Sequence, residues 1–162
     1  MRFTLEPITR DDARAISRWR YGGPYSIYDG NPNSVDSLLD PRFFYHSVRD
    51  ERGDLVGYFC FGEDARVSAG RRLGLYEREP ALDIGLGMRP DLTGRGLGGE
   101  FVHAGLRFAR KAYSPQAFRL TVATFNRRAI LVYERAGFEA VESFGAWAPG
   151  GEREWLLMRR GP

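Results

Sequence analysis

The spacing of apolar positions changes between residues 82 and 112. In Leu82–Met88 aliphatic residues alternate with one aspartate and two glycines, and this period of two predicts a strand with one buried face. After Pro90 the apolar residues recur every three or four positions, which predicts a helix with one buried stripe, formed by Leu97, Phe101, Ala104, Phe108 and Ala112. Because Gly85 and Gly87 carry no side chain, the other face of the strand is expected to be open to a ligand.

The same two periods recur along the rest of the chain. Strands are expected at Phe3–Pro7, Phe43–Val48, Leu55–Phe61, Phe118–Thr124, Phe138–Phe144 and Trp155–Met158, and helices at residues 9–19, 34–39 and 127–136. The segments Tyr21–Asn33 and Gly62–Pro80 are expected to be loops, and a turn is expected at Pro149–Gly151. The order β-α-α-β-β-β-α-β-α-β-β predicts an α+β fold, a mixed central sheet flanked by about four helices, in a single domain of residues 1–162.

Composition narrows the class of protein. With 43% hydrophobic and 28% charged residues and no apolar run of membrane length, the chain is expected to be cytoplasmic, without a membrane partner. The net charge of +3 is small and the basic pairs are scattered, so no nucleic-acid partner is expected. The chain has a single cysteine, Cys60, which excludes an internal disulfide and reads as a small buried hydrophobe, and with only two histidines no metal site is expected.

A glycine-rich loop, Thr93-Gly94-Arg95-Gly96-Leu97-Gly98, opens the predicted helix. Unpaired amides at a helix N-terminus form an anion site suited to a phosphate or pyrophosphate. The loop also contains the dinucleotide pattern G-x-G-x-x-G, but that pattern should follow its strand directly and be followed by a strand ending in an acid. Here Pro90–Thr93 intervene and the next strand ends in Phe125 and Asn126. A tight strand-to-helix turn without a ligand stays the alternative.

Two segments together indicate a family. The loop resembles motif A of the GNAT superfamily of acetyl-coenzyme-A-dependent N-acyltransferases, Gln/Arg-x-x-Gly-x-Gly/Ala, at every place but the first, where Thr93 stands. The run TVATFNRRAILVYERAGF resembles motif B, with Asn126 opening a helix and Tyr133 seven residues later. Seven residues are nearly two helical turns, so both side chains lie on one face. The predicted order of elements is also that of the GNAT fold.

The resemblance implies a set of site residues and no metal. Acetyl-CoA would be the acetyl donor, with its pyrophosphate on the backbone of Thr93, Gly94, Arg95, Gly96, Leu97 and Gly98, and with further contacts from Leu86, Gly87 and Met88. Asn126 would bind the pantetheine arm, Tyr133 would protonate the departing thiolate, and Asp83 would take the amine proton, often through water. The alternatives are that Asn126 is only a helix cap, Tyr133 a core aromatic and Asp83 a surface carboxylate.

The expected function is N-acetyl transfer from acetyl-CoA to a primary amine. The acceptor is left open among a protein N-terminus, an aminoglycoside, a polyamine and a small metabolite amine, and a homodimer is compatible with the resemblance. Tyr25 and Tyr28 are expected to line the acceptor pocket, because aromatic faces suit cations. The alternatives are a non-catalytic acyl-CoA-binding or sensing module and, more distantly, a nucleotide-binding oxidoreductase.

Overall fold

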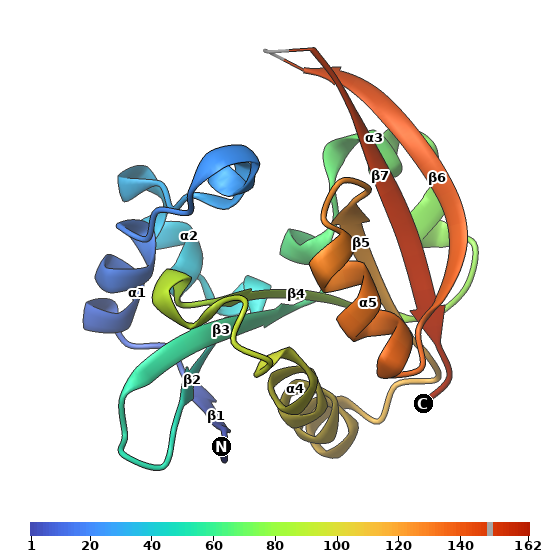
Figure 1. Cartoon of the computed structure of the whole chain (residues 1–162). Coiled ribbons are helices and arrows are strands. Elements are labelled where there is room, and N and C mark those ends of the chain that lie inside the picture. The colour runs from blue at the N-terminus through green and yellow to red at the C-terminus, as the bar shows by residue number, and fades with distance from the viewer. Residues whose placement is uncertain (149–150) are drawn as a thin grey trace.

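The computed structural model describes residues 1–148 and 151–162. In these residues one sheet has the strand order β1-β2-β3-β4-β5-β7-β6. Neighbouring strands are antiparallel except β4 and β5, which are parallel. The strands are β1 (Thr4–Pro7), β2 (His46–Arg49), β3 (Leu55–Phe61), β4 (Leu82–Met88), β5 (Phe118–Ala123), β6 (Glu139–Ala148) and β7 (Gly151–Arg160). This mixed sheet confirms the predicted α+β class (Figure 1).

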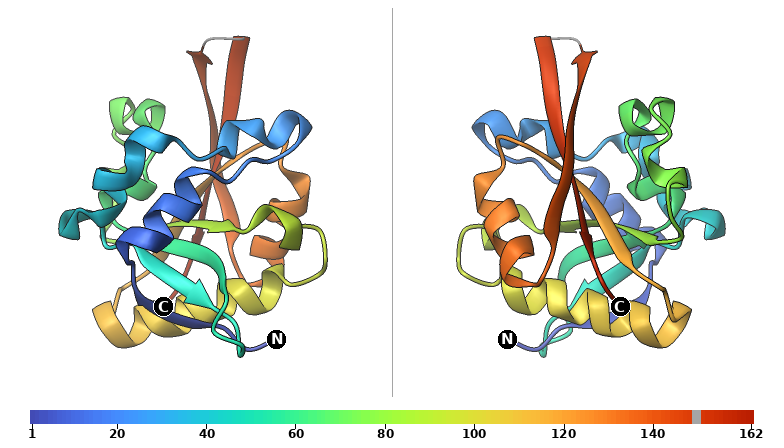
Figure 2. Two further views of the ribbon diagram at one scale, coloured as in Figure 1. Left: turned by 90° about the vertical axis from the view of Figure 1, so that its left-hand side faces the viewer. Right: turned by 90° about the vertical axis from the view of Figure 1, so that its right-hand side faces the viewer.

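Helices cover both faces of the sheet (Figures 1 and 2). Within the described part of the chain they are α1 (Arg10–Ser17), α2 (Val35–Leu39), α3 (Ser68–Arg72), α4 (Gly98–Tyr113) and α5 (Arg127–Arg135). The main core lies between the sheet and the pair α4 and α5, and its largest members include Phe59, Phe61, Phe101, Phe118, Leu106 and Met158. Two smaller clusters fill the other face, one beneath α1 and α2 and one beneath α3.

The two expected loops contain short helices. Tyr21–Asn33 includes the 3-10 helices η1 (Gly23–Tyr28) and η2 (Pro32–Ser34), both with proline in the first turn, where its fixed φ is favourable. Gly62–Pro80 includes α3, which is the additional helix beyond the four that the sequence predicted. A helix this short is stabilised by packing and not by its own periodicity. The buried Leu75 and Tyr76, which follow α3, provide that packing.

Some element boundaries also differ from the prediction. Strand β2 begins at His46, because Pro41–Phe43 forms a 3-10 turn and Phe44 adopts a left-handed φ of 52°. Helix α1 ends at Ser17, before Trp19. Strands β6 and β7 are longer than predicted and form a hairpin that rises beyond the rest of the molecule (Figure 2). The residues by which β7 exceeds the prediction are mostly charged, so they show no apolar alternation. Pro149 and Gly150 of the predicted turn lie outside the described residues.

Among the described residues, no helix combines the length and the apolar character that crossing a bilayer requires.

The close contact between α4 and β3 gives a prediction for stability. A Cβ atom at Gly105 would overlap the ring of Phe59, so Gly105→Ala should lower the free energy of unfolding by about 1–3 kcal/mol. This loss should appear although alanine favours helices by about 1 kcal/mol over glycine. Gly99→Ala is the control in the same helix, because no atom lies within 4 Å of its added Cβ. Chemical denaturation measures both, and equal stability of the two variants would contradict the contact.

Candidate functional site

The candidate site is built around the point where β4 and β5 separate. The two parallel strands pair only at Leu82 with Phe118 and at Asp83 with Arg119, although both continue for several residues. Figure 1 shows the strands pointing away from each other beyond this pair. An opening inside a sheet leaves backbone donors and acceptors without their usual partners. A ligand with amide groups can bind there in place of a strand.

The hydrogen bonds of the β3–β4 ladder decide which backbone groups of β4 face this opening. At one end, the amide of Gly62 donates to the carbonyl of Asp83 at 2.9 Å. At the other end, the amide of Arg89 donates to the carbonyl of Val56 at 2.8 Å. In an antiparallel pair such bonds recur at every second residue. The odd-numbered residues of β4 therefore bond β3, and the even-numbered residues turn their N–H and C=O groups toward β5.

Leu86 and Met88 therefore present their backbone to the opening. Leu82, another even-numbered residue, agrees with this alternation, because its amide donates to the carbonyl of Ala117 at 2.9 Å, on the β5 side. The backbone of Gly87 faces β3 instead. Of the three β4 residues predicted to contact the cofactor, two are thus oriented toward the opening and one is not.

The carbonyl of Met88 already has a partner on another segment. The hydroxyl of Tyr21 donates to it at 2.7 Å. Since the N–H and C=O groups of one strand residue point to the same side, this bond confirms the direction of the Met88 amide. The segment that leads into η1 is therefore tied to the end of β4, a contact that the sequence did not predict.

The second face of β4 is not open, so that expectation is wrong. A Cβ atom at Gly87 would overlap the ring of Tyr58, and one at Gly85 would lie 2.6 Å from the Sγ of Cys60. These residues are direct cross-strand partners in the β3–β4 ladder. The two glycines therefore make room for side chains of β3 and not for a ligand. Strand register decides which residues face each other, and the apolar alternation within one strand does not specify it.

Cys60 is a thiol held away from solvent. Its exposed fraction is 3%, and burial raises its pKa to about 12. A thiol with so high a pKa is protonated at neutral pH and is a poor nucleophile. The prediction of a small buried hydrophobe fits this environment. Within residues 1–148 and 151–162, no group of three or more His, Cys, Asp or Glu side chains is placed to hold a metal ion.

Asp83 lies in a buried ion cluster at the closed end of the opening. The Arg119 guanidinium donates to its two carboxylate oxygens at 2.6 and 2.9 Å, and Nε of Arg66 donates at 2.7 Å. Asp83 and Arg119 have exposed side-chain fractions of 2% and 3%, so the alternative of a surface carboxylate is wrong. The assignment of Asp83 as the base stays a prediction. Its contacts give it a second role, which is to join β4 to β5.

The glycine loop leaves a row of backbone amides free. Gly94 and Gly96 have φ angles of +72° and +78°, which favour glycine. In the described part of the chain, no hydrogen bond engages the amides of residues 94–99. Thr93 turns its hydroxyl inward to donate to the carbonyl of Pro90 at 2.8 Å. The backbone of the loop is thus suited to an anion, whereas the Thr93 side chain closes a turn.

Helix packing explains why residue 98 is a glycine. A Cβ atom there would lie 3.0 Å from a methyl group of Val132, because the start of α4 approaches α5 closely. Leu97, the residue before α4, packs against the main core. These contacts fix the direction in which the free amides of the loop point.

Asn126 is a helix cap with a second contact. Its Oδ1 accepts from the amide of Ala129 at 3.2 Å, which confirms the expected cap of α5. Its Nδ2 donates to the hydroxyl of Tyr28 at 3.2 Å. The side chain therefore connects the start of α5 to the segment η1.

Tyr133 packs its ring in the core and keeps its hydroxyl free. The ring meets Phe138 edge to face, with centroids 6.2 Å apart. Among the described residues its hydroxyl forms no hydrogen bond, yet no buried side-chain polar atom there lacks a partner, so this oxygen reaches accessible space. Burial raises the pKa of the Tyr133 hydroxyl above its ordinary value, and the nearby Tyr28 raises it further. Tyr133 therefore carries its proton at neutral pH.

A cavity of about 190 Å³ lies beside the end of β4. Its lining includes Trp19, Tyr21, Tyr28, Asp29, Tyr45 and Tyr58. Tyr58 stands over Gly87 and Tyr21 bonds Met88, so the cavity adjoins the part of β4 that faces the opening. Tyr28, one of the two tyrosines predicted for an acceptor pocket, lines this cavity. Tyr25 does not line it.

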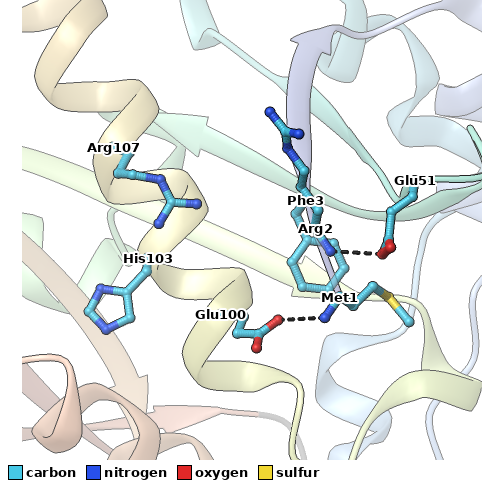
Figure 3. A pocket seen from close by; sticks show the side chains of 7 residues that line it. All are labelled: Met1, Arg2, Phe3, Glu51, Glu100, His103 and Arg107. Atoms are coloured by element: carbon cyan, nitrogen blue, oxygen red, sulfur yellow. Dashed lines mark hydrogen bonds and ion pairs between the residues drawn. The ribbon is translucent and has the colours of Figure 1, made fainter.

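A larger pocket, of about 560 Å³, lies elsewhere and is not the candidate site. It is lined by Met1, Arg2, Phe3, Glu51, Glu100, His103 and Arg107. Figure 3 shows Glu100 of α4 pointing to the amino group of Met1, which donates to its carboxylate at 2.8 Å, and it shows His103 and Arg107 on the same helix. None of the residues predicted for the site lines this pocket.

Several residues of the site carry no signal in the sequence pattern. Tyr21 belongs to a segment expected only to be a loop, and Arg119 is one residue of an apolar strand. Arg128 belongs to one of the scattered basic pairs and is exposed, and its guanidinium lies over the ring of Tyr25. The pairing of a large residue, Tyr58, with Gly87 on the adjacent strand could have indicated the site, but this pairing can be identified only when the strand register is known.

Comparisons with known proteins place this geometry in a family. Residues 2–139 match the family model described as acetyltransferase (GNAT) domain. A mycothiol acetyltransferase of Streptomyces coelicolor is 32% identical over 133 residues, which are 82% of this chain and 38% of that protein. The chain thus spans well under half the length of this curated relative.

Solved structures share the fold. A spermidine N-acetyltransferase chimera from Vibrio cholerae and hSSAT has a TM-score of 0.75 at 18% identity, over 99% of this chain and 96% of that chain. AAC(6')-Ib, solved in complex with parmomycin and acetyl-CoA, has a TM-score of 0.70 at 18% identity, over 99% of this chain and 94% of that chain. Both likenesses support the fold described above.

The ion cluster gives a prediction that tests whether Asp83 joins β4 to β5. Asp83→Asn leaves the buried Arg119 guanidinium without its carboxylate, which should cost about 3–5 kcal/mol of stability. For a chain of this length the melting temperature should fall by on the order of 10 °C. Thermal unfolding measures the loss, with Asp91→Asn, at an exposed ion pair, as the control. A variant that keeps the wild-type melting temperature would contradict the joining role.

Proposed function

This chain belongs to the acetyltransferase (GNAT) domain family, and we propose that it transfers an acetyl group directly from acetyl-CoA to a primary amine. One observation carries the proposal: among the described residues the amides of the glycine loop are free of hydrogen bonds, and the backbone of Leu86 and Met88 faces the opening between β4 and β5. A linear cofactor with an anionic end and an amide-containing arm matches such a row of donors and acceptors. The acetyl-CoA held by AAC(6')-Ib in its solved structure supports the identity of the donor.

The cofactor would bind along this row. Its pyrophosphate would accept from the amides of residues 94–98, where the helix dipole of α4 also favours negative charge. The pantetheine arm would enter the opening and pair with the backbone of Leu86 and Met88, as an added strand would. Asn126 would exchange its bond to Tyr28 for one to this arm.

The reaction needs a polarised carbonyl and an acid. The N–H of Met88 would donate to the thioester oxygen and stabilise the negative charge that develops when the amine attacks the carbonyl carbon. As the C–S bond breaks, the hydroxyl of Tyr133 would give its proton to the departing sulfur, and the acylated nitrogen loses one proton. The accessible oxygen of Tyr133, which carries its proton at neutral pH, supports this role.

The acceptor would occupy the aromatic cavity of about 190 Å³. The cavity adjoins Gly87 and Met88, where the thioester carbonyl is expected. Its aromatic rings and the carboxylate of Asp29 suit a positively charged amine. Tyr28 would form part of its wall, whereas Tyr25 lies against the guanidinium of Arg128.

The route of the amine proton is a separate part of the proposal. Asp83 does not line the cavity, and guanidinium groups occupy both of its oxygens. We therefore assign the first acceptance of this proton to water in the cavity and the positioning of β4 to Asp83. The cytoplasmic location, the homodimer and the absence of a nucleic-acid partner stay predictions from the sequence.

The experiment that tests the function measures thiol release from acetyl-CoA over a panel of amines. The panel includes spermidine, an aminoglycoside, a peptide with a free N-terminus and the acceptor of mycothiol acetyltransferase, following the names of the similar proteins. Release that depends on one of these amines supports the transferase. Binding of acetyl-CoA without release for any primary amine would support the non-catalytic module instead.

The glycine loop gives a prediction for cofactor binding. Gly96→Glu should abolish the thermal stabilisation by acetyl-CoA, because a carboxylate side chain would stand among the amides that bind the pyrophosphate. Gly74→Glu is the matched control, since Gly74 also has a positive φ and open space around its Cβ but lies outside the site. The control should lose similar stability and keep the stabilisation by acetyl-CoA. Loss of the stabilisation in both variants would contradict the assignment of the loop amides as the pyrophosphate site.

Tyr133 gives a prediction for rate and pH. Tyr133→Phe should lower kcat by about 10²–10⁴-fold, with little change in the KM for acetyl-CoA. As the pH rises, kcat/KM of the wild type should increase, because the acceptor amine loses its proton. Because the raised pKa of Tyr133 keeps its proton in place to higher pH, kcat/KM should show no decrease at any pH up to about 10. Turnover of the variant within a few-fold of wild type, or a falling limb near neutral pH, would rule out Tyr133 as the acid.

A further inference from the structure

Arg128 is placed between the glycine loop and η1. Its guanidinium carbon lies 4.6 Å from the centre of the Tyr25 ring. One of its terminal nitrogens would be 3.1 Å from a Cβ atom at Gly94. In the described residues the Arg128 side chain forms no ion pair and no hydrogen bond. A guanidinium without an acid thus stands beside the free amides of the loop.

We propose that Arg128 binds the diphosphate of acetyl-CoA and that Tyr25 is the positioning residue that holds it there. This inference rests on the proposed function, because it adds a ligand to the same cofactor site. A guanidinium presents several N–H donors in a planar fork that matches phosphate oxygens. The amides of the loop approach the diphosphate from α4, and Arg128 approaches it from α5.

The charges around the loop favour this assignment. Asp91, the carboxylate on the turn before the loop, is paired with Arg89, whose Nε donates to it at 2.7 Å. The carboxylate of Asp91 is therefore occupied by Arg89 and does not pair with Arg128. Arg127, the neighbour of Arg128 on α5, is also exposed, and no aromatic ring of the described residues stacks on its guanidinium. Of these two adjacent arginines, only Arg128 is therefore held in place by stacking among the described residues.

Tyr25 makes the position of Arg128 depend on the acceptor side of the molecule. The ring of Tyr25 also packs on Phe125, with centroids 5.6 Å apart. Tyr25 lies on η1, the same segment that places Tyr28 in the cavity wall. Stacking restricts the rotamers of a long side chain and so lowers the entropy lost when it binds a ligand. Cofactor affinity is therefore linked to a segment that lines the acceptor cavity.

Calorimetric titration of the full chain with acetyl-CoA tests the role of Arg128. Arg128→Ala should raise the Kd by about 10- to 100-fold, as expected for a charged hydrogen bond. Arg127→Ala is the matched control and should change the Kd by less than about two-fold, as for an exposed charge without a partner. Circular dichroism shows that each variant is folded. If the wild type binds acetyl-CoA and the two variants bind it equally well, the inference is wrong while the proposed function stands.

Two probes identify the group that Arg128 binds. S-acetylpantetheine lacks all phosphates, so Arg128→Ala should not change its affinity. The acetyl thioester of 3′-dephospho-CoA retains the diphosphate, so the loss should persist with it. Disappearance of the loss with this second probe would overturn the assignment to the diphosphate. If the wild type fails to bind acetyl-CoA at all, the proposed function itself is wrong.

A double-mutant cycle tests the positioning role of Tyr25. Tyr25→Ala should raise the Kd for acetyl-CoA by about two- to five-fold in the wild type, and Tyr25→Phe, which keeps the aromatic face, should not. In the Arg128→Ala background Tyr25→Ala should have no further effect, because the two residues act through one contact. Additive effects in the double variant would show that Tyr25 does not act through Arg128.

Discussion

The buried ion pair between Asp83 and Arg119 fixes the last point at which β4 and β5 touch. Each residue belongs to one strand, and each is the register partner of the other. Two charges removed from water need close, well-directed partners, and the bidentate contact with Nε and a terminal nitrogen provides them. Because the pair holds the strands together at one end, the sheet can open at the other without falling into two halves.

The opening is also bridged on the side of α1 and α2. Tyr21 binds the end of β4, and Tyr28 binds Asn126 at the start of α5. The segment between them therefore spans from one half of the sheet to the other. A ligand that enters between the strands must meet this segment, so the cofactor side and the acceptor side share a wall. One short segment would therefore contact both the cofactor and the acceptor in the proposed reaction.

The sequence predicted the parts of the site that depend on local structure. The alternation in Leu82–Met88, the helix after the glycine loop and the cap at Asn126 all follow from neighbouring residues, and the structure confirms them. The ion pair of Arg119 and the packing of the Tyr58 ring on Gly87 depend on which residues face each other across strands. No local period carries that information, so the ion cluster and the true reason for the β4 glycines came only from the fold.

The cover over Gly87 has a consequence for how this sheet can evolve. The Tyr58 ring fills the space that a side chain at position 87 would need. A larger residue on β4 therefore requires a smaller one on β3. The same exchange applies to Gly85 and Cys60. In homologous chains the two members of each pair should therefore vary together, large with small. A chain in which the larger side chain stands on β4 instead of β3 would keep the same thickness of sheet, but the aromatic cavity that Tyr58 lines would have a different wall.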